Sequence, residues 1–274
     1  KMVFTDQRPA ESVSYDQERL LFTESKKKVR VINRGSRNRP RLYVVNKLNG
    51  PVTVKLDFTN VKNIEFDKRG PFVWSVQPNS DTPLLQFGVR RQGAAWSYHY
   101  EANYILGRSI DPSRHTHSYS LPFRSGTFTV TQGFKRSRSH QMDASGFHAV
   151  DIAMPENTAI VAVRDGVVMD AEGDFSRSGW HQSYMDEANV VRVLHDDGSM
   201  SLYAHLAPDG IVVKKGDQVK TGDLLAYSGN TGFSSGPHLH FVIQANNGSD
   251  LVSLPFVFSG DDRVLKKGVW LSAR

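Results

Sequence analysis

The histidines His238 and His240 stand one residue apart, directly after a loop rich in small residues at 232–237. On a β-strand the side chains of residues i and i+2 point to the same face, so we expect the two imidazoles side by side, with Leu239 buried behind them. Such a pair can serve one metal ion and a water molecule that the ion activates. Two surface histidines on an ordinary strand are the alternative, because a two-residue motif is weak on its own.

The composition restricts the ligands that a metal could have. The chain has 274 residues, 39% of them hydrophobic, which is enough for one large or two medium folded domains. It contains no cysteine, so thiolate metal sites, disulfide bonds and cysteine nucleophiles are excluded. Any metal is therefore bound through nitrogen and oxygen atoms of His, Asp or Glu.

The chain is basic, with a formal net charge of +6 and a pI near 9.4. This balance favours an acidic polymer as partner, such as nucleic acid, an anionic membrane surface or an acidic cell wall. No nucleic-acid motif is present, and the basic runs at 26–28 and 135–138 are interpreted as solvated faces. No apolar stretch is long enough to span a bilayer, and the N-terminus lacks a signal-peptide core, so an export signal is expected to have been removed or to lie outside this numbering.

The first half of the chain predicts a β-sandwich. Residues 1–29 are polar with few apolar anchors and are expected to form an N-terminal arm. Apolar alternation then recurs in short runs, and the Asn-Gly turn at 47–51 indicates a hairpin between 42–46 and 52–58. Strands of this length and spacing predict an immunoglobulin-like β domain over residues 30–106.

The second half also predicts strands. Residues 107–122 are rich in Ser, Arg, Pro and His and are expected to be a linker in which His115 and His117 are solvated. Residues 123–274 are predicted to form a second all-β domain, because short apolar runs alternate with Gly and Asp turns. The expected strands include 159–163, 166–170, 190–194, 201–206 and 224–228.

An ordered series of motifs runs through this second domain. They are Phe-His-Ala-Val-Asp-Ile-Ala-Met-Pro at 147–155, Asn-Val-Val at 189–191, Tyr-Ala-His-Leu at 203–206, Val-Lys-Lys-Gly-Asp-Gln-Val at 213–219, Ser-Gly-Asn-Thr-Gly at 228–232 and His-Leu-His-Phe at 238–241. Over about residues 123–258 the chain resembles the M23 family of zinc metallopeptidases, also called the lysostaphin or LytM family. The resemblance implies a β-barrel-sandwich peptidase domain.

The resemblance implies an endopeptidase that cuts peptide stems or cross-bridges of bacterial peptidoglycan with one zinc ion. It assigns Asp151 and His240 as zinc ligands, and His205 and His238 as the catalytic pair beside the metal-bound water. The residue types suit this chemistry, since three protein ligands leave a fourth position for water, and zinc lowers the pKa of that water to about 7. One histidine would accept the proton of the water, and either could stabilise the oxyanion or protonate the leaving amine.

The first zinc ligand departs from the family pattern. The family places a His four residues before the Asp, where this chain has Phe147, whereas His148 is three residues before it. An odd spacing on a strand turns His148 toward the opposite face. His140 lies in the polar loop 135–146, and some family members resemble this chain in carrying a Ser-His on a longer loop before an Ala-Val-Asp strand. Strand geometry and this likeness together favour His140 over His148.

Other residues near the motifs have two interpretations each. Tyr203 would share a face with His205 and either contacts the oxyanion or packs in the core. Asn189 either contacts the substrate, which is slightly favoured, or caps a strand end. His195 is interpreted as a turn residue, and the insertion 173–188 as one wall of the substrate groove.

Three functions are compatible with these motifs. The favoured one is a zinc endopeptidase that hydrolyses peptidoglycan cross-links in the periplasm or outside the cell, with peptidoglycan rather than nucleic acid as partner. The second is a catalytically inactive wall-binding or activator protein of the same fold, disfavoured because Asp151 and the three histidines assigned above are all present. The third is a secreted bacteriolytic or general protease that uses its first domain for targeting.

Overall fold

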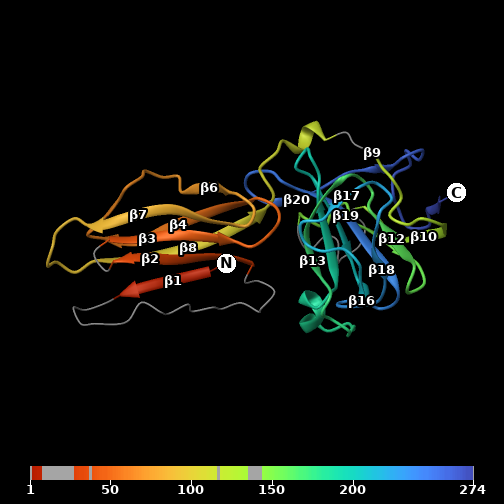
Figure 1. Ribbon diagram of the computed structural model, residues 1–274, viewed down its shortest axis with the longest axis horizontal. Helices are drawn as coiled ribbons and strands as arrows, with labels where there is room; N and C mark the ends of the chain where they lie inside the picture. Colours follow the sequence, from red (N-terminus) through yellow and green to blue (C-terminus); the bar gives the residue numbers. More distant parts are fainter. Residues whose placement is uncertain (1, 8–27, 37–38, 116–117, 135–143, 274) are drawn as a thin grey trace. The chain divides into compact units, whose positions relative to one another are not determined.

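The chain folds into two compact units, Lys1–Leu106 and Gly107–Arg274 (Figure 1). The computed structural model describes residues 2–7, 28–36, 39–115, 118–134 and 144–273. Strands make up most of the regular structure in both units, which confirms the all-β class predicted from the sequence. In the described ranges, no helix is both long enough and apolar enough to cross a membrane.

The first unit is a sandwich of two antiparallel sheets. Its strands are β1 (Met2–Gln7), β2 (Val29–Ser36), β3 (Arg39–Asn46), β4 (Val52–Lys62), β5 (Ile64–Phe66), β6 (Val73–Val76), β7 (Ser80–Val89) and β8 (Ser97–Leu106). One sheet has the order β1-β8-β4-β6 and the other β2-β3-β7-β5. Rings from the two sheets meet, since the centroid of Phe58 on β4 lies 4.7 Å from that of Phe66 on β5. The short alternating runs in the sequence therefore form the two-layer core that they predict.

The expected N-terminal arm differs from the structure at its start. Met2 pairs with Ala102 and Gln7 with Ser97, so β1 is an edge strand of the first unit rather than a free arm. The sequence reasoning missed this strand because the pairing joins segments about ninety residues apart, and only tertiary structure brings them together. The rest of the expected arm, residues 8–27, lies outside the described residues.

The second unit combines one large sheet and one small sheet. Its strands are β9 (Ser118–Tyr119), β10 (Gly126–Gln132), β11 (Val150–Ala153), β12 (Ala159–Val161), β13 (Gly166–Glu172), β14 (Val190–Leu194), β15 (Met200–Ala204), β16 (Leu206–Ile211), β17 (Gln218–Val219), β18 (Leu224–Ser228), β19 (His238–Asn246), β20 (Leu251–Leu254), β21 (Val257–Phe258) and β22 (Trp270–Ala273). The large sheet has the order β17-β13-β14-β15-β19-β11-β10-β22, with β20 also paired to β19, and the small sheet has the order β12-β18-β16.

The large sheet is open and does not close into a barrel on its own. In the part of the chain that the structure describes, its end strands β17 and β22 do not pair with each other. Closure is not needed to cover the apolar face, because buried residues of the small sheet such as Ile160 and Leu225 belong to the same core. The domain is therefore a sandwich of an open sheet and a smaller one.

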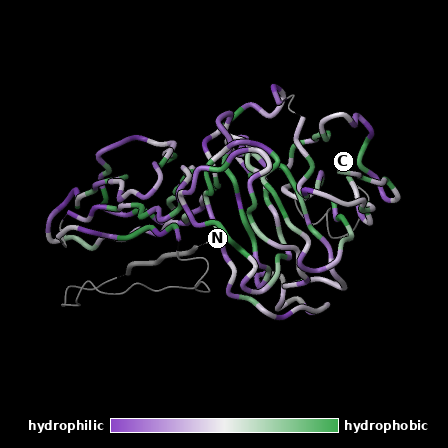
Figure 2. Tube along the Cα trace, turned by 45° about the vertical axis from the view of Figure 1, so that its right-hand side comes forward, coloured by the Kyte–Doolittle hydropathy of each residue, from purple (hydrophilic) through white to green (hydrophobic). Residues whose placement is uncertain are grey.

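The two faces of the large sheet differ in polarity. Residues directly opposite each other on neighbouring strands share a face, so the register tells which side chains lie together. Hydrophobic stretches run along the central strands of this unit, with hydrophilic turns at their ends (Figure 2). One row of the apolar face runs through Val191, Tyr203, Phe241 and Val150, which are all fully buried.

Residues 107–115 and 118–122 form part of the second unit, whereas their composition predicts a linker. Tyr119 is fully buried, and its hydroxyl lies 3.3 Å from Ser199 Oγ and 3.3 Å from His115 Nε2. β9 pairs in parallel with β21. The His115 side chain is 3% exposed, which corrects its expected solvation, whereas His117 lies outside the described residues. One buried aromatic residue anchors an otherwise polar segment, and composition alone does not reveal this.

Replacing Tyr119 with alanine should lower the free energy of unfolding of the second unit by about 3–5 kcal/mol, the usual cost of removing a buried aromatic ring. The measurement is urea denaturation followed by circular dichroism. Ser118→Ala, at the exposed neighbouring position, is the control and should change the free energy by less than about 0.5 kcal/mol. Small and equal effects of the two substitutions would contradict the packing of this segment.

Candidate active site

The centre of the polar face is a contact between two neighbouring strands. Asp151 on β11 stands directly opposite His240 on β19, and its Oδ1 lies 2.8 Å from Nδ1 of the imidazole. Asp151 is only 4% exposed, and its neighbours Val150 and Ile152 are fully buried in the core on the other face. A buried carboxylate requires a polar partner, so the contact between Asp151 and His240 determines where the site forms.

His238 joins this pair from the same strand. It lies two residues before His240 on β19, opposite Ala153, and its Nε2 is 3.9 Å from Asp151 Oδ1. Its Nδ1 donates a hydrogen bond to the carbonyl of Gly236 at 2.8 Å. Because Nδ1 is bound to Gly236, Nε2 is the ring nitrogen that faces Asp151.

His205 approaches from the end of β15. Its φ of +61° takes the chain out of the strand, and its ring centroid lies 4.6 Å from that of His238 and 5.9 Å from that of His240. Its Nδ1 donates to the carbonyl of Thr231 at 2.7 Å. Burial, together with the electrostatic effect of His238 and His240, lowers the pKa of His205 to about 3. His205 is therefore a neutral imidazole whose Nε2 can accept a proton.

Backbone carbonyls of the loop 229–237 orient both of these histidines. Thr231 holds His205 and Gly236 holds His238, each through Nδ1. The sequence reasoning missed these two residues, because a carbonyl acceptor has no signature in the residue type. The only feature of the sequence that pointed to Thr231 and Gly236 was that they lie in a loop of small residues.

Gly232 lies in the middle of this loop at a position where only glycine fits. Its φ is +82°, and a Cβ there would lie 2.7 Å from the Cβ of Ala188, at the end of the insertion 173–188. The close approach therefore docks the insertion onto the loop that orients the histidines.

Tyr203 does not reach the site, which corrects its expected contact with the oxyanion. It pairs with Phe241 on the core face, is fully buried, and its hydroxyl accepts a hydrogen bond from Val163 N at 2.9 Å. The prediction assumed that the strand continues through His205. The strand ends at Ala204, and the positive φ of His205 breaks the two-residue alternation.

Asn189 is also structural rather than a substrate contact. It is fully buried, its Oδ1 accepts from Phe175 N at 2.9 Å, and its Nδ2 donates to Phe175 O at 2.8 Å. Its backbone N donates to Thr231 Oγ1 at 3.0 Å. Asn189 thus ties the insertion 173–188 to the loop that holds His205.

Of the two candidates for the first zinc ligand, the structure describes only His148. The His148 ring is bound to Ser253, with Nδ1 3.1 Å from both the carbonyl oxygen and Oγ, and it packs edge-on against Phe134 at 5.3 Å. This placement agrees with the expectation that an odd spacing turns His148 away from Asp151. His140 lies outside the described residues.

The donor set of Asp151 and His240 suits a zinc ion. Two ligands at about 2.0–2.1 Å in a tetrahedral site lie roughly 3.3 Å apart, and the observed oxygen-to-nitrogen distance of 2.8 Å is close to this value. Within the described ranges no group of three His, Cys, Asp or Glu side chains is arranged to hold a metal.

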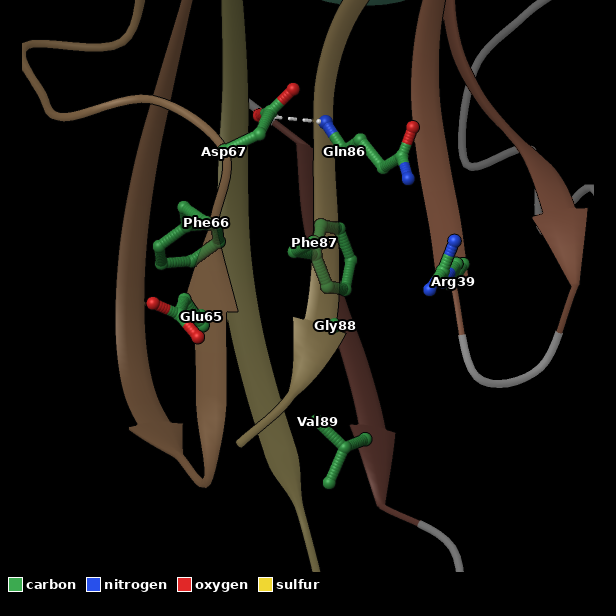
Figure 3. A pocket seen from close by; sticks show the side chains of 8 residues that line it. All are labelled: Arg39, Glu65, Phe66, Asp67, Gln86, Phe87, Gly88 and Val89. Carbon is green, nitrogen blue, oxygen red and sulfur yellow. Dashed lines mark hydrogen bonds between the residues drawn. The ribbon is translucent and has the colours of Figure 1, made fainter. Parts of the chain in front are cut away.

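A separate hollow of about 300 Å³ lies on the first unit, between β5 and β7. Figure 3 shows its lining side chains, among them Phe66 and Phe87, with the Gln86 backbone N donating to Asp67 Oδ1 at 2.9 Å. None of the residues singled out from the sequence lines it. The hollow is therefore unrelated to the predicted chemistry.

Comparison with known proteins identifies a domain in the second unit. Residues 146–251 match peptidase family M23. This range includes Asp151 and the clustered histidines at 205, 238 and 240. His140 lies before the range.

Three curated relatives match the same part of the chain. An uncharacterized metalloprotease of Buchnera aphidicola is 36% identical over 109 residues, which is 40% of this chain and 24% of the relative. The glycyl-glycine endopeptidase ALE-1 of Staphylococcus capitis is 31% identical over 122 residues, 43% of this chain and 31% of the relative. The peptidoglycan DD-endopeptidase ShyA of Vibrio cholerae is 32% identical over 116 residues, 42% of this chain and 24% of the relative. The chain spans less than a third of the length of each of them.

His195 lies apart from the cluster and is buried, although it sits at the hairpin end where a turn residue was expected. It is 3% exposed, with Nδ1 2.8 Å from Asp165 O and Nε2 3.1 Å from Ser201 Oγ. Burial is the main cause that lowers its pKa from 6.5 to about 4; the charge of Arg164 acts in the same direction, and those of Asp197 and Asp196 oppose it. The folded state therefore favours neutral His195.

Lowering the pH from 6.5 to 4 should destabilise the second unit through His195. The unfolded chain binds a proton in this window that the folded chain does not, so up to about 3 kcal/mol of stability is present above pH 6.5 and is lost as the pH falls toward 4. Urea denaturation at several pH values should show a shallower loss in His195→Gln than in the exposed control His181→Gln. Parallel pH profiles for the two variants would rule out this role.

Proposed function

Because the second unit contains a domain of peptidase family M23, we propose that this chain is a zinc-dependent endopeptidase that hydrolyses peptide cross-links of bacterial peptidoglycan. The convergence of three imidazoles on the buried carboxylate of Asp151, from β19 and the end of β15, supports this proposal best. Two of the relatives are named for such bonds, one as a peptidoglycan DD-endopeptidase and one as a glycyl-glycine endopeptidase. Peptidoglycan as substrate implies a periplasmic or extracellular location.

Asp151 Oδ1 and His240 Nδ1 would hold the zinc ion, with His140 as the third ligand. One observation favours His140 over His148: the His148 ring is bound to Ser253. When bound, zinc polarises the scissile carbonyl and makes a water molecule acidic enough to attack near neutral pH.

The two remaining histidines, His205 and His238, would transfer protons during the hydrolysis. His205 accepts the proton of the attacking water at Nε2, since its ring is neutral and its Nδ1 is committed to Thr231 O. His238 in its protonated form donates from Nε2 to the oxyanion, while Gly236 O keeps its ring in place. The proton then passes to the leaving amine as the C–N bond breaks, which yields a carboxylate and an amine.

A catalytically inactive wall-binding or activator protein of the same fold is the second candidate. The observation that favours it is that Phe147 stands where the family pattern has its first histidine ligand. Activity on purified sacculi separates the two candidates. A general protease is the third outcome of the same experiment, because it would also degrade a glycine-rich protein such as elastin.

Purified sacculi incubated with the parent protein should release peptide fragments whose masses identify one cleaved cross-link, because the site is built for hydrolysis. The Asp151→Ala variant is the control and should release none, since the buried carboxylate is a zinc ligand in this proposal. Mass spectrometry of the released muropeptides is the measurement. Binding of sacculi without any release by the parent protein would support the inactive wall-binding protein instead.

The histidines should separate into ligands and catalytic residues when zinc content and turnover are measured on the same samples. His240→Ala should lose zinc and activity together, because it removes a ligand. His205→Ala should retain zinc and lose about 10²–10⁴-fold in turnover, the usual contribution of a general base. Equal zinc content in His240→Ala and the parent protein would remove His240 from the ligand set.

The first ligand can be assigned by comparing two matched substitutions. His140→Ala should weaken zinc binding by at least about tenfold, whereas His148→Ala should leave it nearly unchanged because that ring is bound to Ser253. Titration with a zinc-buffered chelator measures both. The opposite result would make His148 the ligand and would require a rearrangement of its contact with Ser253.

A further inference from the structure

The insertion 173–188 is joined by backbone hydrogen bonds to the loop that leads into the histidine pair. Gly179 N donates to Gly232 O at 3.1 Å, and Gly232 N donates to Arg177 O at 2.8 Å. Ser178 forms a parallel β-bridge with the same glycine. These contacts fix the tip of the insertion at the edge of the site.

The contact presents an aromatic corner formed by Trp180 and Phe233. Their ring centroids are 5.1 Å apart with an interplanar angle of 76°, an edge-to-face arrangement. Trp180 is 73% exposed, the largest fraction among the exposed large hydrophobic residues of the described ranges, and Phe233 is half-buried. An indole held in place by a neighbouring ring and a fixed backbone is a preformed apolar surface.

The aromatic corner is attached to both catalytic histidines through consecutive residues. Thr231, one residue before Gly232, holds His205 through its carbonyl. Ser234, directly after Phe233, lies with its Oγ 3.3 Å from His238 Nδ1. The corner and the contacts that orient the two histidines therefore belong to one short stretch of the loop, residues 231–234.

We infer that Trp180 and Phe233 determine specificity for the residue beside the scissile bond, and that they favour stem-peptide cross-links over oligoglycine bridges. This inference rests on the proposed endopeptidase function. Stem peptides carry methyl and longer aliphatic side chains, which leave water when they pack against the two rings. Glycine has no side chain to bury there, so an oligoglycine substrate gains nothing from the corner.

The corner can be removed without disturbing the backbone contacts that hold the insertion. Trp180→Ala deletes the indole, whereas the hydrogen bonds between the insertion and Gly232 use only main-chain atoms. Trp180→Phe keeps an aromatic ring and is the conservative variant. Val212→Ala, at a half-exposed aliphatic residue that follows β16 of the small sheet, is the matched control for loss of apolar surface.

The experiment measures kcat/KM for two soluble substrates, a cross-linked stem-peptide dimer and pentaglycine. The parent protein should prefer the dimer. Trp180→Ala should lower kcat/KM for the dimer about tenfold and leave pentaglycine cleavage unchanged, because only the dimer contacts the ring. Trp180→Phe should recover most of the loss, and Val212→Ala should behave as the parent does. Equal losses on both substrates, or a parent preference for pentaglycine, would overturn the inference.

A binding measurement separates failure of the inference from failure of the proposed function. Calorimetry with the His205→Ala protein and the same two substrates needs no turnover, and adding Trp180→Ala should weaken dimer binding about tenfold. If the parent cleaves neither substrate but dimer binding depends on Trp180, the endopeptidase proposal is wrong, whereas the role of the aromatic corner in recognising the stem peptide is supported. If neither turnover nor binding depends on Trp180, the aromatic corner fails.

Discussion

A carboxylate buried in the middle of a β-sheet is costly unless a polar partner faces it, and in this chain the partner is an imidazole on the next strand. Asp151 and His240 face each other because β11 and β19 pair in one register, with the apolar residues on either side of Asp151 pointing into the core. A slip of one residue would turn the whole strand over and place the carboxylate in the core. The core that holds the sheet together thus also holds the pair in place.

Backbone geometry sets the second constraint on the site. His238 lies on β19 and His205 directly follows β15, and each is oriented by a carbonyl of the loop 229–237. Because these acceptors are main-chain atoms on a loop that also contacts the insertion 173–188, the ring positions depend on how that loop docks. Asn189 connects the insertion to this loop, because it forms hydrogen bonds both with Phe175 at the start of the insertion and with Thr231.

Much of the site was predictable from local spacing. His238 and His240 share a face because the period of a strand is two. His148 lies in a turn before β11, where its ring is bound to Ser253. The prediction failed for Tyr203, where alternation was extended through a residue that has already left the strand with a positive φ. It also failed for Asn189, because its side-chain amide donates hydrogen bonds to the backbone carbonyls of Phe175 and Ala207, which lie elsewhere in the sequence.

The sequence by itself determined the all-β class, the nitrogen and oxygen character of any metal ligand, and the common face of the histidine pair. These properties follow from residue type and from periodicity within one strand, which need no knowledge of distant segments. The tertiary structure decided that Tyr119 anchors segment 107–122, that the large sheet stays open, and that Trp180 meets Phe233 at the edge of the site. Each of these depends on contacts between segments far apart in the chain, and residue spacing carries no record of such contacts.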